Sequence, residues 1–318
     1  MKHKKILITG TNGFIGENLL EYFSERPRNY KVFSPKRKEL DLLNDMAVSK
    51  YIKANKIEVV IHCASCGGTR KNNYDEGNVD IVSQNLRMFF NLSRCLTPDM
   101  RMINMGSGAE YDKRNSMHKI KETFFDKHVP IDSYGYSKYI IAKYIEKTDN
   151  IINLRIFGLY GKYEDYSYKF ISNTIVKNIL GLPITINQNV SFDYSHIEDF
   201  VKIVDKFIAI KPKYKHYNAT PSKSIDLVGI AELINKMSSK KSKIKVLNSG
   251  MNIEYTGSNL RLRNEFKGFS FTKYEEGIAE LYNYYLSCRD DIDFKTIKQD
   301  DCIKYCKKIA KKPERFYL

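Results

Sequence analysis

The sequence lacks any long apolar run. None of its 318 residues belongs to a stretch that approaches the roughly 20 consecutive apolar residues needed to cross a bilayer. The apolar segment near the basic N-terminus is also too short for a signal peptide, and glycine and polar residues follow it at once. We therefore expect a first strand there rather than a leader, and no membrane partner.

Cysteine is sparse, and its spacing does not suggest a metal site. The six cysteines are scattered through a long chain, which is typical of reduced thiols in the cytoplasm. Cys63 and Cys66 have C-x-x-C spacing, but no second pair lies at zinc-ribbon distance. We predict a cytoplasmic protein without a bound metal.

Acidic residues are too few to balance the basic ones. The chain has 53 Lys and Arg against 37 Asp and Glu, a formal net charge of +16. Such an excess favours anionic partners, or marks only a lysine-rich solvated surface. The lysines are spread out, with denser clusters at 36–38 and 307–312, and neither glycine–arginine repeats nor zinc-finger spacing accompanies them. We predict no nucleic-acid partner, which leaves anionic small molecules such as nucleotides.

A strand, a glycine turn and a helix open the chain. Ile6 to Ile8 form an apolar run, and apolar residues from Ile15 to Phe23 then recur at helical spacing. Between them lies a G-x-x-G-x-x-G turn, which lets a pyrophosphate approach the amides at the start of the helix. The turn consists of Gly10, Gly13 and Gly16. This context predicts a dinucleotide-binding site.

The next segments alternate between strands and helices, which predicts an α/β fold with a Rossmann-type doubly wound parallel sheet. Expected strands are 30–34, 57–65, 101–107 and 150–157, and expected helices are 44–56, 82–96 and one that holds Tyr134. We assign 1–160 to this domain, with a later strand returning near 190–220. Residues 161–286 are predicted to form a smaller, partly interleaved α/β substrate domain, and 287–318 a helical extension.

The segment "DSYGYSKYII" places Tyr134 and Lys138 four residues apart, so a helix would put both on one face. Tyr136 would point elsewhere. A free phenol has a pKa of about 10 and is a poor base at neutral pH. A nearby ammonium favours the phenolate and lowers that pKa.

Five motifs in order resemble the extended short-chain dehydrogenase/reductase family of nucleotide-sugar enzymes. They are the glycine turn with "YGYSK", "VVIHCAS", "LRIFGLYG", "FDYSHIEDF" and "IEYTGSNLRLRNEFKGFSFTKYEEGI". The resemblance implies that Tyr134 is the general acid/base, that Lys138 tunes it and holds the nicotinamide ribose, and that Ser107 hydrogen-bonds the substrate oxygen. Asn85, in mid-helix, is expected to be structural.

The run from 32 to 65 and the loop "SCGGTRKNN" resemble one branch, the GDP-fucose synthases. The second strand ends at Ser34 without an acidic residue, and Lys36, Arg37 and Lys38 follow. A basic cluster there suits the 2′-phosphate of NADP, whereas an acidic residue would bind the ribose of NAD. The expected NADPH site comprises Gly10, Gly13, Phe14, Ile15, Gly16, Ser34, Lys36, Arg37, Asp41, Leu42, Ala64 and Lys138.

Three reactions are common in the family: 4,6-dehydration, epimerisation and keto-sugar reduction. Dehydratases place Asp-Glu directly after the catalytic residue, whereas Gly108 and Ala109 follow Ser107 here. Glu110 should point to the other face if the strand continues. Epimerising relatives use a Cys where Ala109 stands and a His near Lys169. Unless Cys66, His62 or His196 substitutes for them, epimerisation is not expected.

The resemblance therefore predicts a cytoplasmic, NADPH-dependent reductase of a nucleotide-linked 4-keto sugar, without epimerisation. The nucleotide is expected to be GDP, with CDP next, and the sugar a deoxyhexose or heptose destined for a surface polysaccharide. A nucleotide-sugar 4-epimerase holding NAD and a non-catalytic dinucleotide-binding regulator remain alternatives, and a homodimer is expected. Gly158 and Phe192 stand where relatives have Asn and Arg. The predicted substrate residues are Gly67, Gly68, Ser107, Gly108, Ala109, Lys169 and Phe192.

Overall fold

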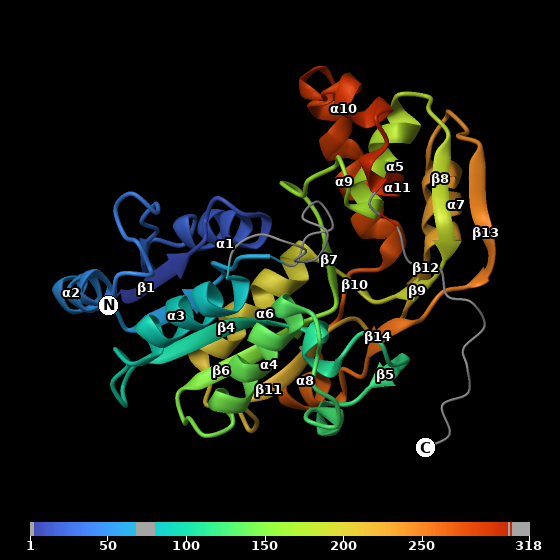
Figure 1. The fold of residues 1–318 in the computed structure, drawn as a ribbon. Helices are drawn as coiled ribbons and strands as arrows, with labels where there is room; N and C mark the ends of the chain where they lie inside the picture. Colours follow the sequence, from blue (N-terminus) through green and yellow to red (C-terminus); the bar gives the residue numbers. More distant parts are fainter. Residues whose placement is uncertain (1–2, 68–79, 305, 307–318) are drawn as a thin grey trace.

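The protein has a larger and a smaller region, and a six-stranded parallel sheet forms the centre of the larger one (Figure 1). The computed structural model describes residues 3–67, 80–304 and 306. The strand order is β11-β6-β4-β3-β1-β2, with every neighbouring pair parallel. The strands are β1 (Lys4–Thr9), β2 (Tyr30–Phe33), β3 (Val59–His62), β4 (Arg101–Ser107), β6 (Ile151–Ile156) and β11 (His216–Ala219).

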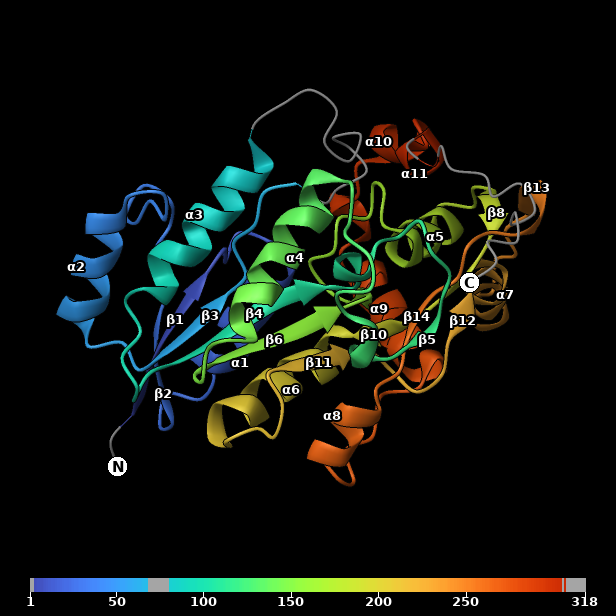
Figure 2. The ribbon, with the colours of Figure 1, turned by 60° about the horizontal axis from the view of Figure 1, so that its bottom comes forward.

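Helices cover both faces of this sheet, because its strands are apolar on both sides. In β1, Ile6 and Ile8 pack in the core on one face, and Leu7 packs in the core on the other. Figure 2 shows α2, α3 and α4 on one side of the sheet and α6 on the other. The predicted Rossmann-type fold is thus confirmed. One layer comprises α1 (Phe14–Ser24), α6 (Ile197–Ala209) and α8 (Leu260–Glu265); the other comprises α2 (Asp45–Asn55), α3 (Ile81–Ser93) and α4 (Ser133–Ile145).

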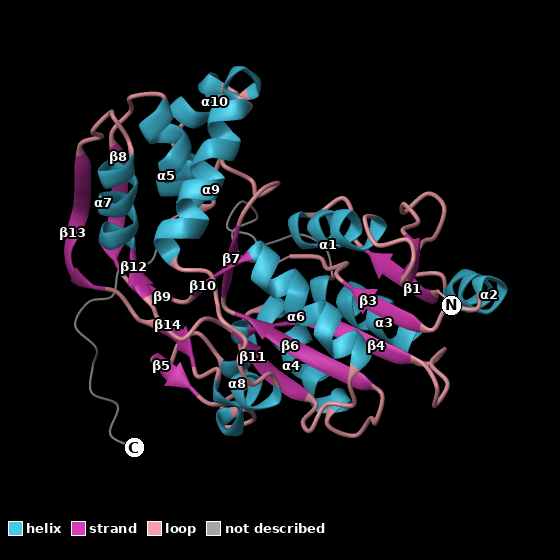
Figure 3. Cartoon of the chain, turned by 180° about the vertical axis from the view of Figure 1, so that it is seen from behind, coloured by secondary structure: helices cyan, strands magenta, loops and turns pink. Residues whose placement is uncertain are grey.

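A smaller region lies beyond one end of the sheet (Figure 3). Its core is formed by three helices, α5 (Phe170–Ile179), α7 (Leu227–Met237) and α9 (Tyr274–Ser287). Two parallel strands, β8 (Ile184–Asn189) and β13 (Ile244–Met251), pack beside α7. Short strands complete it: β7 (Gly158–Tyr160), β9 (Ser191–Phe192), β10 (Tyr194–His196), β12 (Ile225–Asp226) and β14 (Tyr255–Gly257).

The chain passes back and forth between the two regions. A four-stranded sheet of order β12-β9-β14-β5 joins late strands to β5 (Met117–Ile120), which follows β4 closely in sequence. After β10, the chain returns through α6 and β11 to the main sheet. Consequently neither region is one continuous stretch of sequence.

Residues after α9 pack against the smaller region. They form a turn of 3₁₀ helix (Arg289–Asp291), α10 (Phe294–Lys298) and α11 (Asp301–Lys304). Ile297 is buried in the core with α5, and the buried Lys177 ammonium of α5 pairs with Asp300 at 2.6 Å. The rest of the predicted extension lies outside the described residues. Nowhere in the described ranges is there a helix with the length and apolarity to cross a membrane.

The glycine turn generates a stability prediction. A β-carbon on Gly16 would lie 2.3 Å from the Gly10 carbonyl oxygen, a backbone atom that can move only with the turn. We expect Gly16→Ala to lower the free energy of unfolding by about 1–3 kcal/mol. At Gly13 the same atom would lie 3.5 Å away, so Gly13→Ala should cost less than about 1 kcal/mol. Urea unfolding of both variants checks this, and equal losses would contradict it.

Candidate active site

The glycine turn lies where β1 and β3 end. The Thr9 hydroxyl at the end of β1 accepts hydrogen bonds from the N–H groups of Cys63 and Ala64, each at 3.2 Å. Gly10 has φ +71°, and a β-carbon there would meet Ala64 N at 2.6 Å. The glycine turn is therefore held between the end of β1 and the end of β3. Gly13 is the N-cap of α1 and offers no capping side chain, so the first amides of α1 keep the anion-binding character of a helix N-terminus.

A pocket of about 400 Å³ opens beside this turn. Seven predicted cofactor residues line it together: Gly10, Gly13, Lys36, Arg37, Asp41, Leu42 and Ala64. Phe14, Ile15, Gly16, Ser34 and Lys138 are not among its lining residues. The structure thus brings the turn, the basic cluster and the end of β3 around one cavity, and binding of NADPH there stays a prediction.

The basic cluster follows β2. Lys36 and Arg37 are exposed and line the pocket, whereas Lys38 is exposed but does not line it. The Lys36 backbone N–H donates to the Glu39 carboxylate at 2.7 Å, which shapes this loop. Two cationic side chains therefore reach the rim of the pocket next to the end of β2.

Helix α4 presents Tyr134 and Lys138 on one face and Tyr136 on another. Asp132 caps the helix by accepting from Gly135 N at 2.8 Å. The Lys138 ammonium is buried, donates to the Met105 carbonyl at 2.8 Å, and lies 5.6 Å from the centre of the Tyr134 ring. Tyr136 is 40% exposed. Burial lowers the pKa of Lys138 to about 8, and the Glu110 charge opposes that change.

Ser107 ends β4, and the chain turns there into a 3₁₀ helix, Gly108–Tyr111. The Ser107 hydroxyl oxygen accepts from Ala109 N at 3.1 Å, and the Glu110 carboxylate accepts from Ser107 N at 2.9 Å. The expectation that Glu110 alternates to the other face applied only to a continuing strand, and this condition is not met because the strand stops at Ser107. Glu110 instead folds back beneath Ser107 and is fully buried.

Residues from the smaller region approach the end of β4 at Ser107. A β-carbon on Gly108 would lie 2.4 Å from the Tyr255 hydroxyl, so this hydroxyl of β14 lies directly against the loop after Ser107. The predicted substrate residue Phe192 packs on Tyr255, with ring centres 5.8 Å apart. The Lys113 ammonium lies 5.9 Å from the ring centre of Tyr134 and 6.0 Å from that of Tyr255.

The sequence reasoning missed Tyr255 and Lys113 as site residues. Tyr255 lies in the C-terminal segment that carries the family resemblance, so that segment contained a usable signal. Lys113 follows Tyr111 in a loop whose path depends on the 3₁₀ turn, and spacing alone gives no indication of it.

The other predicted substrate residues are placed as follows. Gly67 has φ +75° and follows Cys66, and Gly68 lies outside the described residues. Lys169 is the exposed N-cap of α5, and its ammonium lies 5.4 Å from the centre of the Tyr168 ring. Asn85 is buried and bonds the backbone of Cys66 and the Ser137 hydroxyl, which fits the expected structural role.

The groups considered as substitute acids or bases are poorly suited to that role. His62 is buried against the Thr9 hydroxyl at 2.9 Å, and burial together with the Lys138 charge lowers its pKa to about 3. Burial also raises the pKa of the Cys66 thiol. Neither side chain therefore exchanges a proton readily near neutral pH.

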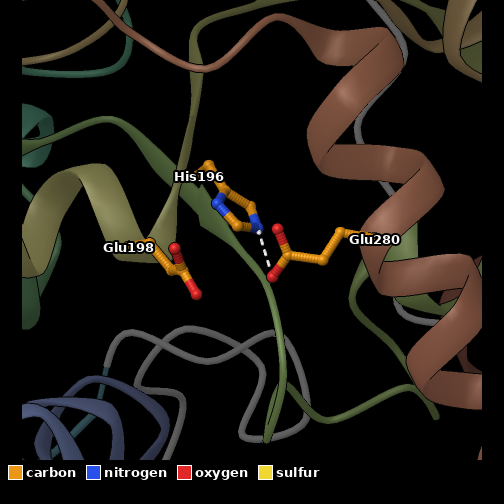
Figure 4. A group of neighbouring side chains, drawn as sticks. All are labelled: His196, Glu198 and Glu280. Atoms are coloured by element: carbon orange, nitrogen blue, oxygen red, sulfur yellow. Dashed lines mark ion pairs between the residues drawn. The ribbon is translucent and has the colours of Figure 1, made fainter.

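His196 belongs to a separate cluster with Glu198 and Glu280 (Figure 4). The buried His196 ring lies 3.8 Å from the Glu280 carboxylate, across the junction of α6 and α9. Both carboxylates are exposed, and Glu198 also pairs with Lys202 at 3.7 Å. His196 is the N-cap residue of α6. The cluster therefore combines one buried ring with two carboxylates on the solvated surface.

Comparison with known proteins identifies the family. The profile of the NAD dependent epimerase/dehydratase family matches residues 6–220, more than half of the chain. The chain belongs to this family of NAD-dependent enzymes, and the predicted resemblance is confirmed. The GDP-L-colitose synthase of Yersinia pseudotuberculosis is 26% identical over 191 residues, which cover 56% of this chain and 61% of that protein. The chain thus matches less than two thirds of that relative's length.

Solved structures share the fold. A GDP-mannoheptose C4 reductase from Campylobacter jejuni with NADP bound has a TM-score of 0.75 at 18% identity, covering 90% of this chain and 99% of that one. A UDP-glucose 4-epimerase with UDP-glucose from Thermotoga maritima gives the same TM-score, identity and coverage. Likeness at this level establishes the fold and leaves the reaction to the residues of the site.

The register of α4 generates a catalytic prediction. If Tyr134 is the general acid, as its sequence motif predicts, Tyr134→Phe should reduce turnover by about 10²- to 10⁴-fold, while binding of NADPH stays within a factor of a few. Tyr136→Phe, on the exposed face, should change little. Steady-state kinetics and fluorescence titration of NADPH check both variants. An essential Tyr136 with a dispensable Tyr134 would contradict the assignment.

Proposed function

We propose that the protein reduces the 4-keto group of a nucleotide-linked sugar with NADPH, without epimerising neighbouring carbons. The observation that carries the proposal is the convergence of Ser107, Tyr134 and Lys138 at the carboxyl end of the sheet, next to the pocket of the glycine turn. Together, the Ser107 hydroxyl, the Tyr134 phenol and the buried Lys138 ammonium can form a proton-transfer site. A regulator that only binds a dinucleotide would not need it.

Each of the three residues has a distinct role. When bound, NADPH supplies the hydride that adds to the carbonyl carbon. The Tyr134 hydroxyl gives its proton to the carbonyl oxygen as that oxygen gains negative charge. The Ser107 hydroxyl, whose oxygen already accepts from Ala109 N, is left with a hydrogen to donate to the same oxygen. The Lys138 ammonium favours the phenolate that remains on Tyr134.

The choice of NADPH rests on the rim of the pocket. Lys36 and Arg37 line it, and the last residues of β2 are apolar, so no acidic side chain ends that strand. Cations at this place favour a 2′-phosphate over a free ribose hydroxyl pair. We propose that Arg37 contacts that phosphate, because its fork of donors matches phosphate oxygens.

The substrate is proposed to be a GDP-linked deoxyhexose or heptose. Support comes from the motifs shared with the GDP-fucose synthase branch and from relatives named as GDP-L-colitose synthase and GDP-L-fucose synthase. The apolar Phe192 and the Tyr255 hydroxyl would then flank the sugar beside Ser107. A cytoplasmic location, a homodimer and a place in polysaccharide synthesis belong to the same proposal.

A 4-epimerase is the second candidate, because the Thermotoga maritima epimerase shares the fold equally well. Such an enzyme returns the hydride to the same carbon and keeps its NAD bound through the cycle. Purified protein carrying NAD, with conversion of a nucleotide sugar in the absence of added cofactor, would favour it. NADPH oxidation with a panel of nucleotide 4-keto sugars, with products identified by NMR, tests the reductase directly.

A cofactor prediction follows from the pocket rim. We expect a preference for NADPH over NADH of about 10- to 100-fold, since one ion-paired phosphate contributes roughly 1.5–3 kcal/mol. Arg37→Ala should reduce this preference, while Lys38→Ala, at a residue off the pocket, serves as the control. The ratio of kcat/KM for the two cofactors is the measurement. A ratio near one that Arg37→Ala leaves unchanged would contradict it.

A second prediction concerns carbons 3 and 5 of the sugar. Epimerisation requires one group to remove a proton beside the ketone and another to return it from the opposite face. Ala109 can do neither, and His62 stays neutral at its pKa of about 3. Turnover in D₂O with NADPH should therefore add no deuterium at these carbons beyond a control without enzyme. Deuterium there with inverted configuration, read by NMR, would reveal a second acid/base pair.

A further inference from the structure

Beneath Ser107 lies a fully buried ion pair that the reaction scheme above does not use. Arg155 of β6 donates to the Glu110 carboxylate at 2.5 Å, and both side chains are buried. Asn153 donates to the two Glu110 oxygens at 3.1 and 3.0 Å. Glu110 is thus held by two side chains of one strand while it accepts from Ser107 N at 2.9 Å.

The same carboxylate abuts the segment of β4 that accepts the Lys138 ammonium of α4. A β-carbon on Gly106 would lie 2.6 Å from a Glu110 oxygen, so the carboxylate rests on the Gly106 backbone. The preceding residue, Met105, accepts the Lys138 ammonium through its carbonyl at 2.8 Å. Three consecutive residues of β4 are therefore fixed: Met105 by Lys138, and Gly106 and Ser107 by Glu110.

Resting on the proposed reductase function, we propose that Glu110 is a positioning residue of the active site. Its carboxylate fixes the Ser107 backbone through a hydrogen bond, and its negative charge, which also pairs with Arg155, favours the protonated form of the buried Lys138 side chain. These are two separable effects, one of geometry and one of charge.

The charge effect has a defined direction. Burial lowers the pKa of Lys138 to about 8, and Glu110 opposes this. Lys138 is faced by Glu110, by Cys63 and His62 of β3, and by Tyr134 of α4. His62 has a pKa of about 3 and Cys63 of about 12, so neither changes charge between pH 6 and 9. Without the Glu110 charge, Lys138 loses its proton at lower pH, and the alkaline decline of activity moves down with it.

Two double variants separate the effects. Glu110→Gln/Arg155→Met removes both charges but keeps an oxygen for Ser107 N, whereas Glu110→Leu/Arg155→Met removes the charges and the hydrogen bond. Both remove Glu110 and Arg155 together, so neither member of this pair stays buried without the other, and apolar replacement of a buried ion pair is often neutral for folding. Glu122→Gln is the control: Glu122 is also buried, accepts from Asn218 N and pairs with Arg261 at 3.8 Å.

We expect the alkaline limb of the kcat profile to move down by about one pH unit in both double variants and to stay in place in the control. Only the Leu variant should lose kcat at its plateau, by about 10- to 100-fold, with NADPH binding unchanged. The charge effect would be overturned if both double variants fold and keep the alkaline limb of the wild type. The geometric effect would be overturned if the Gln and Leu variants have the same kcat at the plateau. If the Leu variant does not fold, the position of the alkaline limb in the Gln variant tests the charge effect by itself.

A readout without turnover separates this proposal from the proposed function. The pH titration of the Lys138 side chain is read by NMR of protein with ¹³C-labelled lysine, and its signal is assigned by its absence in a Lys138→Met version. The Glu110→Gln/Arg155→Met protein should titrate at Lys138 at lower pH than the wild type, because the negative charge that favours the ammonium is gone. That shift, without reduction of any keto sugar, would refute the reductase and retain Glu110 as a positioning residue. No shift would overturn the role of Glu110 whatever the substrate.

Discussion

The burial of the Lys138 ammonium is the constraint on which the proposed catalytic site around Ser107 and Tyr134 depends. A charge removed from water must find polar partners, and here it finds a strand carbonyl at 2.8 Å and the field of a buried carboxylate. That requirement ties α4 to β4, and β4 to β6 through the ion pair of Glu110 and Arg155. Helix, strand and 3₁₀ turn are thus held in one arrangement around Ser107.

The polar interior under this site extends across three strands. Asn104 of β4 donates to Asn153 of β6 at 2.7 Å, and Asn153 lies opposite His216 of β11. At the next step, Tyr111 donates to Asn218 of β11 at 2.7 Å. Two buried atoms of this network, Asn104 Oδ1 and His216 Nε2, have no hydrogen-bond partner among the described residues. The bonds that are formed connect β4, β6 and β11, so a different packing of these strand ends would break several buried hydrogen bonds at once.

The sequence allowed the main sheet and the pairing of Tyr134 with Lys138 to be predicted, because both follow from local periodicity. The apolar run of β1 and the four-residue spacing on α4 are visible without any distant contact. The place of Glu110 could not be predicted, since it lies in a 3₁₀ turn and its buried partner Arg155 is 45 positions along the chain. Tyr255 was missed for the same reason: only the pairing of β14 with β5 and β9 brings it to Gly108.

The interleaving of the two regions also affects how the protein is made. On the ribosome, β5 emerges long before β14, the strand it pairs with in the finished sheet. Until Tyr255 has been synthesised, the loop after Ser107 lacks the ring that packs on Gly108. A nascent chain can therefore assemble the glycine turn and its pocket early, but it completes the surroundings of Ser107 only after Tyr255 has been synthesised.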